Sequence, residues 1–385
     1  MTEAHAYLGA DIFDGAARLR GHAMLLEGGR VSAIMAEDAI PDAAKVTRLD
    51  GGLIVPGFVD LQVNGGGGVM FNDDPSVDVL RVMARAHAGL GATAILPTLI
   101  TDTARHTRAA IAAVDAARAA GVAGILGLHL EGPHLSVARK GAHDAGLIRE
   151  MGADDLALIC EAATRLPVLK VTLAPESVTP DQIATMVAAG VIVSLGHSDA
   201  GFETCMKAAE AGATCVTHLF NAMSQLGNRE PGLVGAALTC GALSAGLIAD
   251  GIHVHPATIR AALAAKAGPG RVFLVSDAMS VAGSKQREFT LNGRLIRREG
   301  GRLTLEDGTL AGADLDQLTA IRNLVGWDIT SETEALAMAT SIPADVIGVA
   351  GHGRLIPGGP ADFLHLDGTG RARVWQAGVP LPPAL

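Results

Sequence analysis

The sequence predicts an α/β protein built as a (β/α)8 barrel of the TIM type, with a small β-sandwich domain formed by both chain ends. Two observations support this prediction. Through the middle of the 385 residues, short apolar runs alternate with Ala-, Leu- and Arg-rich segments, and the apolar runs end in residues that can carry chemistry. Apolar strands that alternate with helices imply a parallel sheet, and eight such units make a closed barrel.

Eight apolar runs are predicted as the barrel strands. They occupy residues 58–64, 92–98, 124–131, 169–175, 191–197, 215–220, 244–250 and 272–278. Helices are predicted at 78–91, 104–121 and 179–190, and each of these segments ends in Gly, which helix C-termini prefer. The uncharged run 231–249 approaches the length of a membrane span, but it is rich in Gly, Ser and Thr. We therefore predict a loop, a helix and a buried strand there, and no membrane attachment.

The two ends of the chain have a different pattern. Residues 1–52 and 351–385 contain short strand-like runs that are separated by Gly and Pro turns. Neither end is long enough to bury a core alone, so we expect the two to pair into one small β-sandwich domain. The predicted barrel then occupies residues 53–350.

Composition narrows the class of partner. The formal net charge is −10 and no basic stripe is visible, which argues against binding to nucleic acid. A phosphate group would need a local cation, because the overall charge repels anions. The four cysteines are far apart and form no C-x-x-C pair. Together with a start that lacks a secretory signal, this predicts a protein of the reducing cytoplasm.

Three predicted strands end in good metal ligands. Glu131, His197 and His218 close the third, fifth and sixth runs. Since the C-terminal ends of barrel strands meet at one rim, these side chains are expected to converge on one divalent metal with an open position for water. The alternative is a buried ion-pair carboxylate and two satisfied core histidines. His129 faces the same way as Glu131 and is expected deeper in the barrel.

Further candidates follow other strands. Asp277 ends the eighth run and is predicted as the general base, with a helix cap or turn residue as the alternative. Arg229 lies on a Gly- and Pro-rich loop and is a candidate anion ligand, unless it pairs with Glu230 on the surface. The backbone N–H groups of Asn221 and Ala222 are candidates for the same anion.

Two more loops carry polar residues that belong to the predicted rim. Some of these residues are expected to be solvated loop positions only. They are His134, Arg139, Lys140 and His143 in residues 131–144, and Asp250, His253 and His255 in residues 249–256.

The chain resembles the N-acetylglucosamine-6-phosphate deacetylases, a branch of the amidohydrolase superfamily. The combination "NAM…REPG…ADGIHV" is specific for this branch, whereas "PGFVD" occurs across the superfamily. The matching segments occur in order over nearly the whole chain: "PGFVDLQVNGGGGVMFND", "LHLEGPHLSVARKGAHD", "VTLAPE", "SLGHSDA", "THLFNAMS", "REPGLVGAAL", "IADGIHVHP", "LVSDAMS" and "GTLAGADLDQLTAIRNLV".

The resemblance implies hydrolysis of the acetamide of N-acetylglucosamine 6-phosphate. It implies one divalent metal per subunit on the three ligands, zinc with iron(II) as the alternative, and Asp277 as acid and base. His143 would polarise the acetyl carbonyl, and Arg229 would reach the site of a neighbouring subunit in a homodimer. The other implied substrate-binding residues are Ala142, Asn221, Ala222, Asp250, His253, Leu310, Ala311 and Gly312.

One segment departs from the two-metal pattern of the superfamily. Where many members have His-x-His, this chain has Gln62 and Asn64, as members with a single metal do. His134 stands where a large apolar or aromatic residue is expected. The rival substrate is N-acetylgalactosamine 6-phosphate, which differs at one hydroxyl group. A cyclic-amide hydrolase or a deaminase is disfavoured by the missing His-x-His, and a non-catalytic barrel by the retained ligand set.

Overall fold

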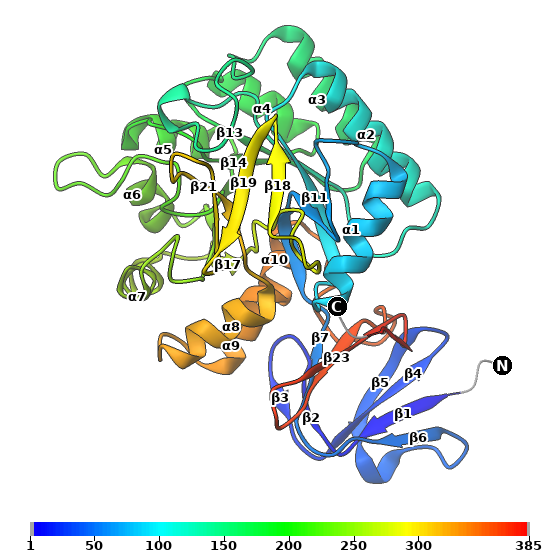
Figure 1. Cartoon of the computed structure of the whole chain (residues 1–385). Coiled ribbons are helices and arrows are strands. Elements are labelled where there is room, and N and C mark those ends of the chain that lie inside the picture. The colour runs from blue at the N-terminus through cyan, green and yellow to red at the C-terminus, as the bar shows by residue number, and fades with distance from the viewer. Residues whose placement is uncertain (1–3, 383–385) are drawn as a thin grey trace.

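The predicted barrel is confirmed by the structure, a computed structural model that describes residues 4–382. Eight parallel strands form one sheet in the order β17-β16-β15-β14-β13-β12-β11-β8. A parallel bridge between Val63 and Ala278 joins the two edges, so the sheet closes (Figure 1). The barrel strands are β8 (Val59–Val63), β11 (Ala94–Ile100), β12 (Leu128–Glu131), β13 (Leu169–Leu173), β14 (Ile192–Leu195), β15 (Cys215–Val216), β16 (Ser244–Leu247) and β17 (Val272–Leu274).

Helices cover the outside of the barrel, and local signals fix where they begin. Thr179 and Gln182 form a capping box at the start of α4, whose first residue is Pro180. The helices are α1 (Val77–Gly89), α2 (Ala104–Ala119), α3 (Ala153–Arg165), α4 (Pro180–Ala188), α5 (Phe202–Glu210), α6 (Gly232–Thr239), α7 (Pro256–Ala265), α8 (Gln317–Gly326), α9 (Glu332–Ala339) and α10 (Ser341–Val346). The run 231–249 forms α6 and β16 as predicted, and no helix among residues 4–382 is suited to cross a membrane.

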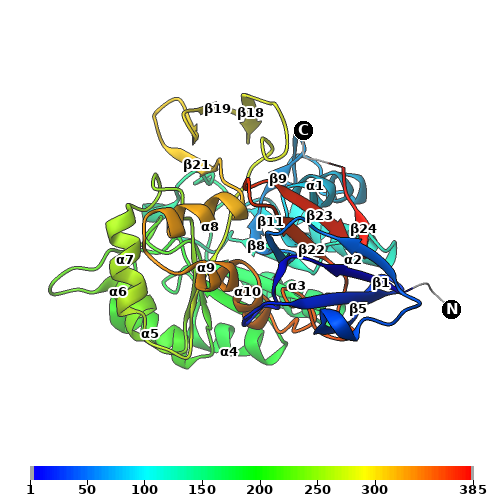
Figure 2. The same ribbon diagram turned by 90° about the horizontal axis from the view of Figure 1, so that it is seen from below.

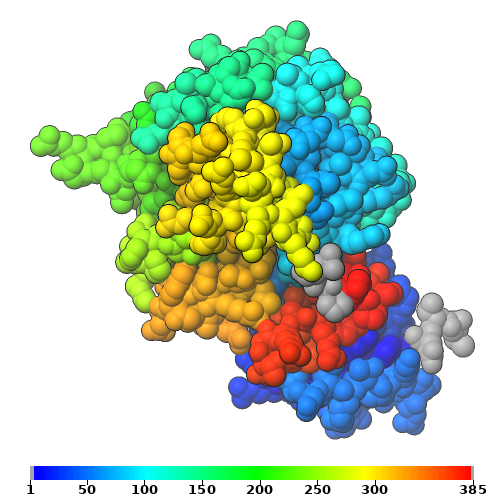
Figure 3. All heavy atoms as spheres, in the orientation of Figure 1, coloured from blue at the N-terminus to red at the C-terminus, as the bar shows by residue number. Residues whose placement is uncertain are grey.

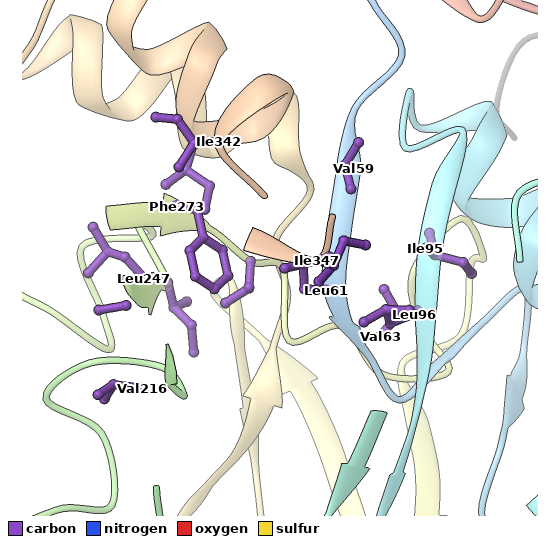
Figure 4. Packing of buried hydrophobic residues seen from close by; sticks show 14 of the residues in the cluster. Val59, Leu61, Val63, Ile95, Leu96, Val216, Leu247, Phe273, Ile342 and Ile347 are labelled. Carbon is purple, nitrogen blue, oxygen red and sulfur yellow. The ribbon is translucent and has the colours of Figure 1, made fainter. Parts of the chain in front are cut away.

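The barrel core consists of Val, Leu, Ile and Ala side chains from the strands and from the inner faces of the helices. Leu61, Val216 and Leu247 are completely buried, and Phe273 packs beside them (Figure 4). Each such aliphatic side chain contributes about 1.5–3 kcal/mol on burial. This rigid base holds the strand ends, and with them the polar side chains at the rim.

The two ends of the chain share a sheet outside the barrel. Strand β22 pairs antiparallel with β7, and β7 pairs parallel with β2, so first and last segments lie side by side (Figure 2). A second sheet packs on it around Tyr7, Met24 and Phe363. The strands are β1 (His5–Leu8), β2 (Asp11–Phe13), β3 (Arg18–Leu19), β4 (His22–Glu27), β5 (Arg30–Ala36), β6 (Lys45–Arg48), β7 (Leu53–Pro56), β22 (Phe363–Leu366), β23 (Ala372–Gln376) and β24 (Val379–Pro380). The domain boundaries at 52/53 and 350/351 stay a prediction.

An inserted four-stranded antiparallel sheet follows β17 and was not expected from the sequence. Its strands are β18 (Glu288–Leu291), β19 (Arg294–Glu299), β20 (Arg302–Thr304) and β21 (Leu310–Ala313). Asn292 and Gly293 form its first turn, both with positive φ, as a two-residue hairpin requires. Figure 3 shows this sheet on the surface beside the barrel, and a separate small core that includes Met279 and Leu291 attaches it.

Phe363→Ala should lower the free energy of unfolding by about 3–5 kcal/mol, the usual cost of emptying a buried aromatic site. The Phe363 ring is fully buried and stacks on Trp375 at a centroid distance of 4.7 Å. Urea unfolding followed by circular dichroism measures the change. Val379→Ala, at a side chain that is 62% exposed, is the control and should cost less than about 0.5 kcal/mol. Equal effects of the two substitutions would contradict this packing.

Candidate functional site

A cavity of about 370 Å³ lies at the C-terminal ends of the barrel strands. Its floor contains Glu131, His197, His218 and Asp277, which the sequence placed at four separate strand ends. The walls come from the loop after β12, the turn after β15, the loop after β16 and the inserted sheet. The remaining lining residues are Asn64, Ile100, Ala138, Arg139, Gly141, Ala142, His143, Asn221, Ala222, Ile248, His253, Met279, Leu291, Thr309, Leu310 and Gly312.

Glu131, His197 and His218 direct three ligand atoms at one point. Glu131 Oε1 lies 3.1 Å from His197 Nε2 and 3.0 Å from His218 Nε2, and the two ring nitrogens are 3.1 Å apart. The His197 Nδ1–H donates to the carbonyl oxygen of Arg139 at 2.9 Å, which leaves the Nε2 lone pair free for a metal. Three electron-pair donors at this spacing, all buried, fit a divalent cation.

The charge of Glu131 is stabilised despite its burial. Burial alone raises the pKa of this carboxyl group, but the adjacent rings of His197 and His218 outweigh burial and hold the pKa well below its usual range. The group is therefore a carboxylate at neutral pH, as a metal ligand must be.

The backbone turns sharply at the ligand positions. His197, His218 and Asp277 have φ values of 47°, 29° and 50°, and Ala222 on the neighbouring turn has 49°. Residues with a β-carbon rarely adopt this left-handed region, at a cost of about 1–3 kcal/mol each, and such residues cluster at functional sites. The turns direct the side chains into the barrel mouth instead of along the strand.

Asp277 is held by the Gln-x-Asn pair of β8. Its Oδ1 accepts hydrogen bonds from Gln62 Nε2 at 3.1 Å and Asn64 Nδ2 at 2.8 Å, while Gln62 Nε2 also lies 3.2 Å from both oxygens of Glu131. The side chain caps no helix, since the following helix α8 is capped by Asp316. Burial, followed by the charge of Glu131, raises the pKa of Asp277 to about 6.

His143 completes the floor of the cavity from the loop after β12. The backbone N–H of Thr101 donates to His143 Nδ1 at 3.3 Å, which assigns the ring proton to Nε2. Burial lowers the pKa of His143 to about 3, so the ring is neutral at pH 7. One of its nitrogens lies within 4.8 Å of ligand atoms of Glu131 and His197. A neutral imidazole here can donate a hydrogen bond to a group beside the metal position.

The structure brings most of the predicted rim residues together, but not all. Ala142, Asn221, Ala222, His253, Leu310 and Gly312 line the cavity, whereas Arg229, Asp250 and Ala311 do not. Asp250 instead accepts a hydrogen bond from His253 Nδ1 at 2.6 Å and thereby orients that ring. Arg229 lies in an exposed loop, residues 225–230, that extends away from the barrel just before α6 (Figure 1).

Two candidate histidines have structural roles outside the cavity. His134 is buried, its Nδ1 lies 3.2 Å from the carbonyl oxygen of Arg149, and it does not line the cavity. His255 is the N-cap of α7, where its Nδ1 accepts the backbone N–H of Ala257.

The wall formed by the inserted sheet was missed by sequence reasoning. Leu291 and Thr309 line the cavity, and the guanidinium of Arg294 donates to the carbonyl oxygen of Ala142, which fastens the sheet to the loop after β12. A signal was present, because Asn292-Gly293 between alternating residues is a hairpin pattern.

Comparisons with known proteins agree with this geometry. The model of the amidohydrolase family matches residues 53–380. An N-acetylgalactosamine-6-phosphate deacetylase of Shewanella sp. (strain ANA-3) is 46% identical over 332 residues, which are 86% of this chain and 84% of the relative. An N-acetylglucosamine-6-phosphate deacetylase of Haemophilus influenzae is 35% identical over 334 residues, 86% of either chain. The crystal structure of N-acetylglucosamine-6-phosphate deacetylase from Pasteurella multocida matches with a TM-score of 0.93 and 33% identity, covering 97% of this chain and 98% of that one.

Glu131→Gln is expected to weaken binding of a divalent metal by at least about 100-fold. Substitution of residues that only hydrogen-bond to metal ligands already lowers metal affinity about 10–100-fold. The amide lacks the negative charge that faces His197 and His218. Metal content after dialysis against a weak chelator measures the loss. Glu203→Gln, at an exposed position of α5, is the matched control and should keep its metal. Equal metal content in both variants would exclude Glu131 as a ligand.

Proposed function

The chain belongs to the amidohydrolase family, and we propose that it hydrolyses N-acetylglucosamine 6-phosphate to glucosamine 6-phosphate and acetate. The observation that carries the proposal is one cavity in which a metal-ligand set, the buried carboxylate of Asp277 and a neutral His143 face each other. These are the groups that amide hydrolysis needs. The names of the relatives supply the substrate.

Held by Glu131, His197 and His218, one divalent metal would supply the positive charge that activates water and polarises the acetyl carbonyl. We assign zinc to this site, with iron(II) as the alternative. Asp277 takes the proton of the attacking water and later gives it to the departing amine. Because Gln62 and Asn64 both donate to Oδ1, the Oδ2 atom of Asp277 is left to carry that proton. The Nε2–H of His143 donates to the carbonyl oxygen as negative charge develops there.

The phosphate group is assigned to the outer rim of the cavity. The backbone N–H of Ala222, which follows the left-handed turn at His218, and the ring of His253 are the proposed ligands, and Asn221 lines the cavity beside them. The N–H of Asn221 itself is used within the turn, where it donates to the carbonyl oxygen of His218 at 2.9 Å. Arg229 is proposed to reach the cavity of a second subunit, since its exposed loop extends away from its own barrel. The proposed protein is thus a homodimer. Its four cysteines are free, which suits the cytoplasm we assign to it.

N-acetylgalactosamine 6-phosphate is a second candidate substrate. The observation that favours it is the relative from Shewanella, which is named for this substrate and is 46% identical over 332 residues. The two sugars differ only in the orientation of one hydroxyl group, and the same residues would carry out the chemistry on either.

Acetate release from N-acetylglucosamine 6-phosphate is expected from the metal-loaded protein. Without the phosphate, kcat/KM should fall by at least about 100-fold, since binding energy at a remote group positions the reacting amide. The galactosamine epimer is measured in parallel. A higher kcat/KM for the epimer would assign the second substrate, and no acetate from either sugar phosphate would refute the proposal.

Asp277→Asn should lower kcat by about 10²–10⁴-fold, the usual contribution of a general base, while metal content stays unchanged. In the wild type, kcat/KM should fall as the pH drops, because a protonated Asp277 cannot accept the proton. The midpoint of this fall should lie at or below the pKa of Asp277, which burial raises to about 6, because the charge of a bound metal lowers that pKa. The residual rate of the variant should lack this acidic limb. Full activity of Asp277→Asn would exclude the role.

A further inference from the structure

We propose that Arg139 is a phosphate-binding residue that the chain contributes to its own site, an inference that rests on the function proposed above. Arg139 lies in a segment that matches the known deacetylases, but it is not among the metal ligands or substrate-binding residues that the resemblance implies. Among residues 4–382 it is the one Lys or Arg that lines the cavity. A chain with a net charge of −10 needs such a local cation to hold an anion.

The backbone of Arg139 is fixed to the metal-ligand histidine. Its carbonyl oxygen accepts the Nδ1–H of His197 at 2.9 Å, and its N–H donates to the carbonyl oxygen of Ser136 at 3.0 Å. The N–H of Ser136 in turn donates to the carbonyl oxygen of His197 at 2.8 Å. The short 3-10 helix Val137–Arg139 is therefore fastened to the rim at both ends, so the side chain starts from a defined point.

Arg139 lies at the same edge of the cavity as the proposed phosphate ligands. A β-carbon added to Gly141 would lie 3.4 Å from His197 Cε1 and 4.0 Å from the β-carbon of Ala222. Gly141, two residues after Arg139, thus lies close to Ala222 on the turn after β15. Ser198 forms a backbone bridge with Met223, the residue after Ala222. Asp199, which follows Ser198 and is the ion-pair partner of Arg139, therefore lies near the same turn.

The partner, Asp199, orients the guanidinium without occupying it. Arg139 Nε donates to Asp199 Oδ1 at 2.7 Å, and no hydrogen bond within the described chain uses either Nη group. Asp199 is itself fixed by its N–H, which donates to Glu176 at 2.7 Å. Two Nη groups offer the parallel donors that bind phosphate oxygens, and the charge-assisted bonds they make are strong.

Arg139 and Arg229 would reach one cavity from different subunits. Arg229 lies in the exposed loop 225–230 and lines no part of its own cavity, so its contribution requires a second subunit. Arg139 requires none. A phosphate held by both would have one guanidinium from each subunit of the proposed dimer. Loss of either should then weaken phosphate binding, whereas only loss of Arg139 should do so in a monomer.

The test compares Arg139→Met and Arg139→Lys with Arg105→Met, an exposed position on α2. For N-acetylglucosamine 6-phosphate, Arg139→Met should raise KM about 10- to 100-fold, the worth of hydrogen bonds to a charged group. Its kcat should stay within about threefold, because uniform binding affects KM alone. Arg139→Lys should recover part of the loss, and kcat/KM for unphosphorylated N-acetylglucosamine should not change. Arg105→Met should behave as the wild type.

Binding of inorganic phosphate to the metal-loaded protein, measured by calorimetry, separates the two proposals. Weaker binding in Arg139→Met supports the role of Arg139 even if the wild type releases no acetate, an outcome that would refute only the proposed substrate. An Arg139→Met variant that matches Arg105→Met in KM and phosphate affinity would overturn the role and leave the function intact. An equal loss of kcat on both substrates would mark a structural residue and would overturn it too.

Discussion

The site depends on one shared oxygen atom, Oε1 of Glu131, which lies 3.0–3.1 Å from the Nε2 atoms of His197 and His218. A buried carboxylate costs several kcal/mol unless charges or hydrogen bonds compensate for its lost hydration. Here the compensation comes from His197 and His218 at two other strand ends and from the Gln62 amide on β8. The geometry therefore exists only if the whole barrel closes in the correct register, and fold and site depend on the same interactions.

Closure of the barrel and the position of Asp277, the proposed general base, are linked in the same way. Both oxygens of the fully buried Asp60 on β8 accept the backbone N–H of Ser276, at 3.1 Å and 3.3 Å. Asp277 is the next residue, and its φ of 50° turns it toward Gln62 on β8 and Asn64 directly after that strand. A strained backbone conformation persists only where several neighbouring interactions hold it in place. The first and last strands supply those surroundings, so the seam of the barrel is also where the base is held.

The strand ends could be predicted from the sequence, because apolar runs and their terminal polar residues are local patterns. Glu131, His197, His218 and Asp277 meet at the C-terminal ends of the barrel strands, as expected. The inserted sheet was missed, since its half-exposed strands alternate weakly, and only the turns at Asn292 and Gly300 mark it. The left-handed backbone at His197 and His218 has no sequence signal, because residues other than Gly seldom adopt it. That His134 lies outside the cavity depends on where a loop folds back, which local patterns do not determine.

The charges of the cavity are arranged in two layers. The floor holds two carboxylates, Glu131 and Asp277, whereas the rim holds the guanidinium of Arg139. A divalent metal is attracted to the carboxylates of the floor, and an anionic group is attracted to the guanidinium at the rim. For a substrate with a phosphate at one end and a neutral amide at the other, this order favours a single orientation, with the amide inward. Orientation that is fixed before reaction lowers the entropy to be lost in the transition state. The guanidinium at the rim also explains how a strongly negative chain can bind an anionic substrate. Close to the cavity, the local positive potential outweighs the repulsion by the net charge of the chain.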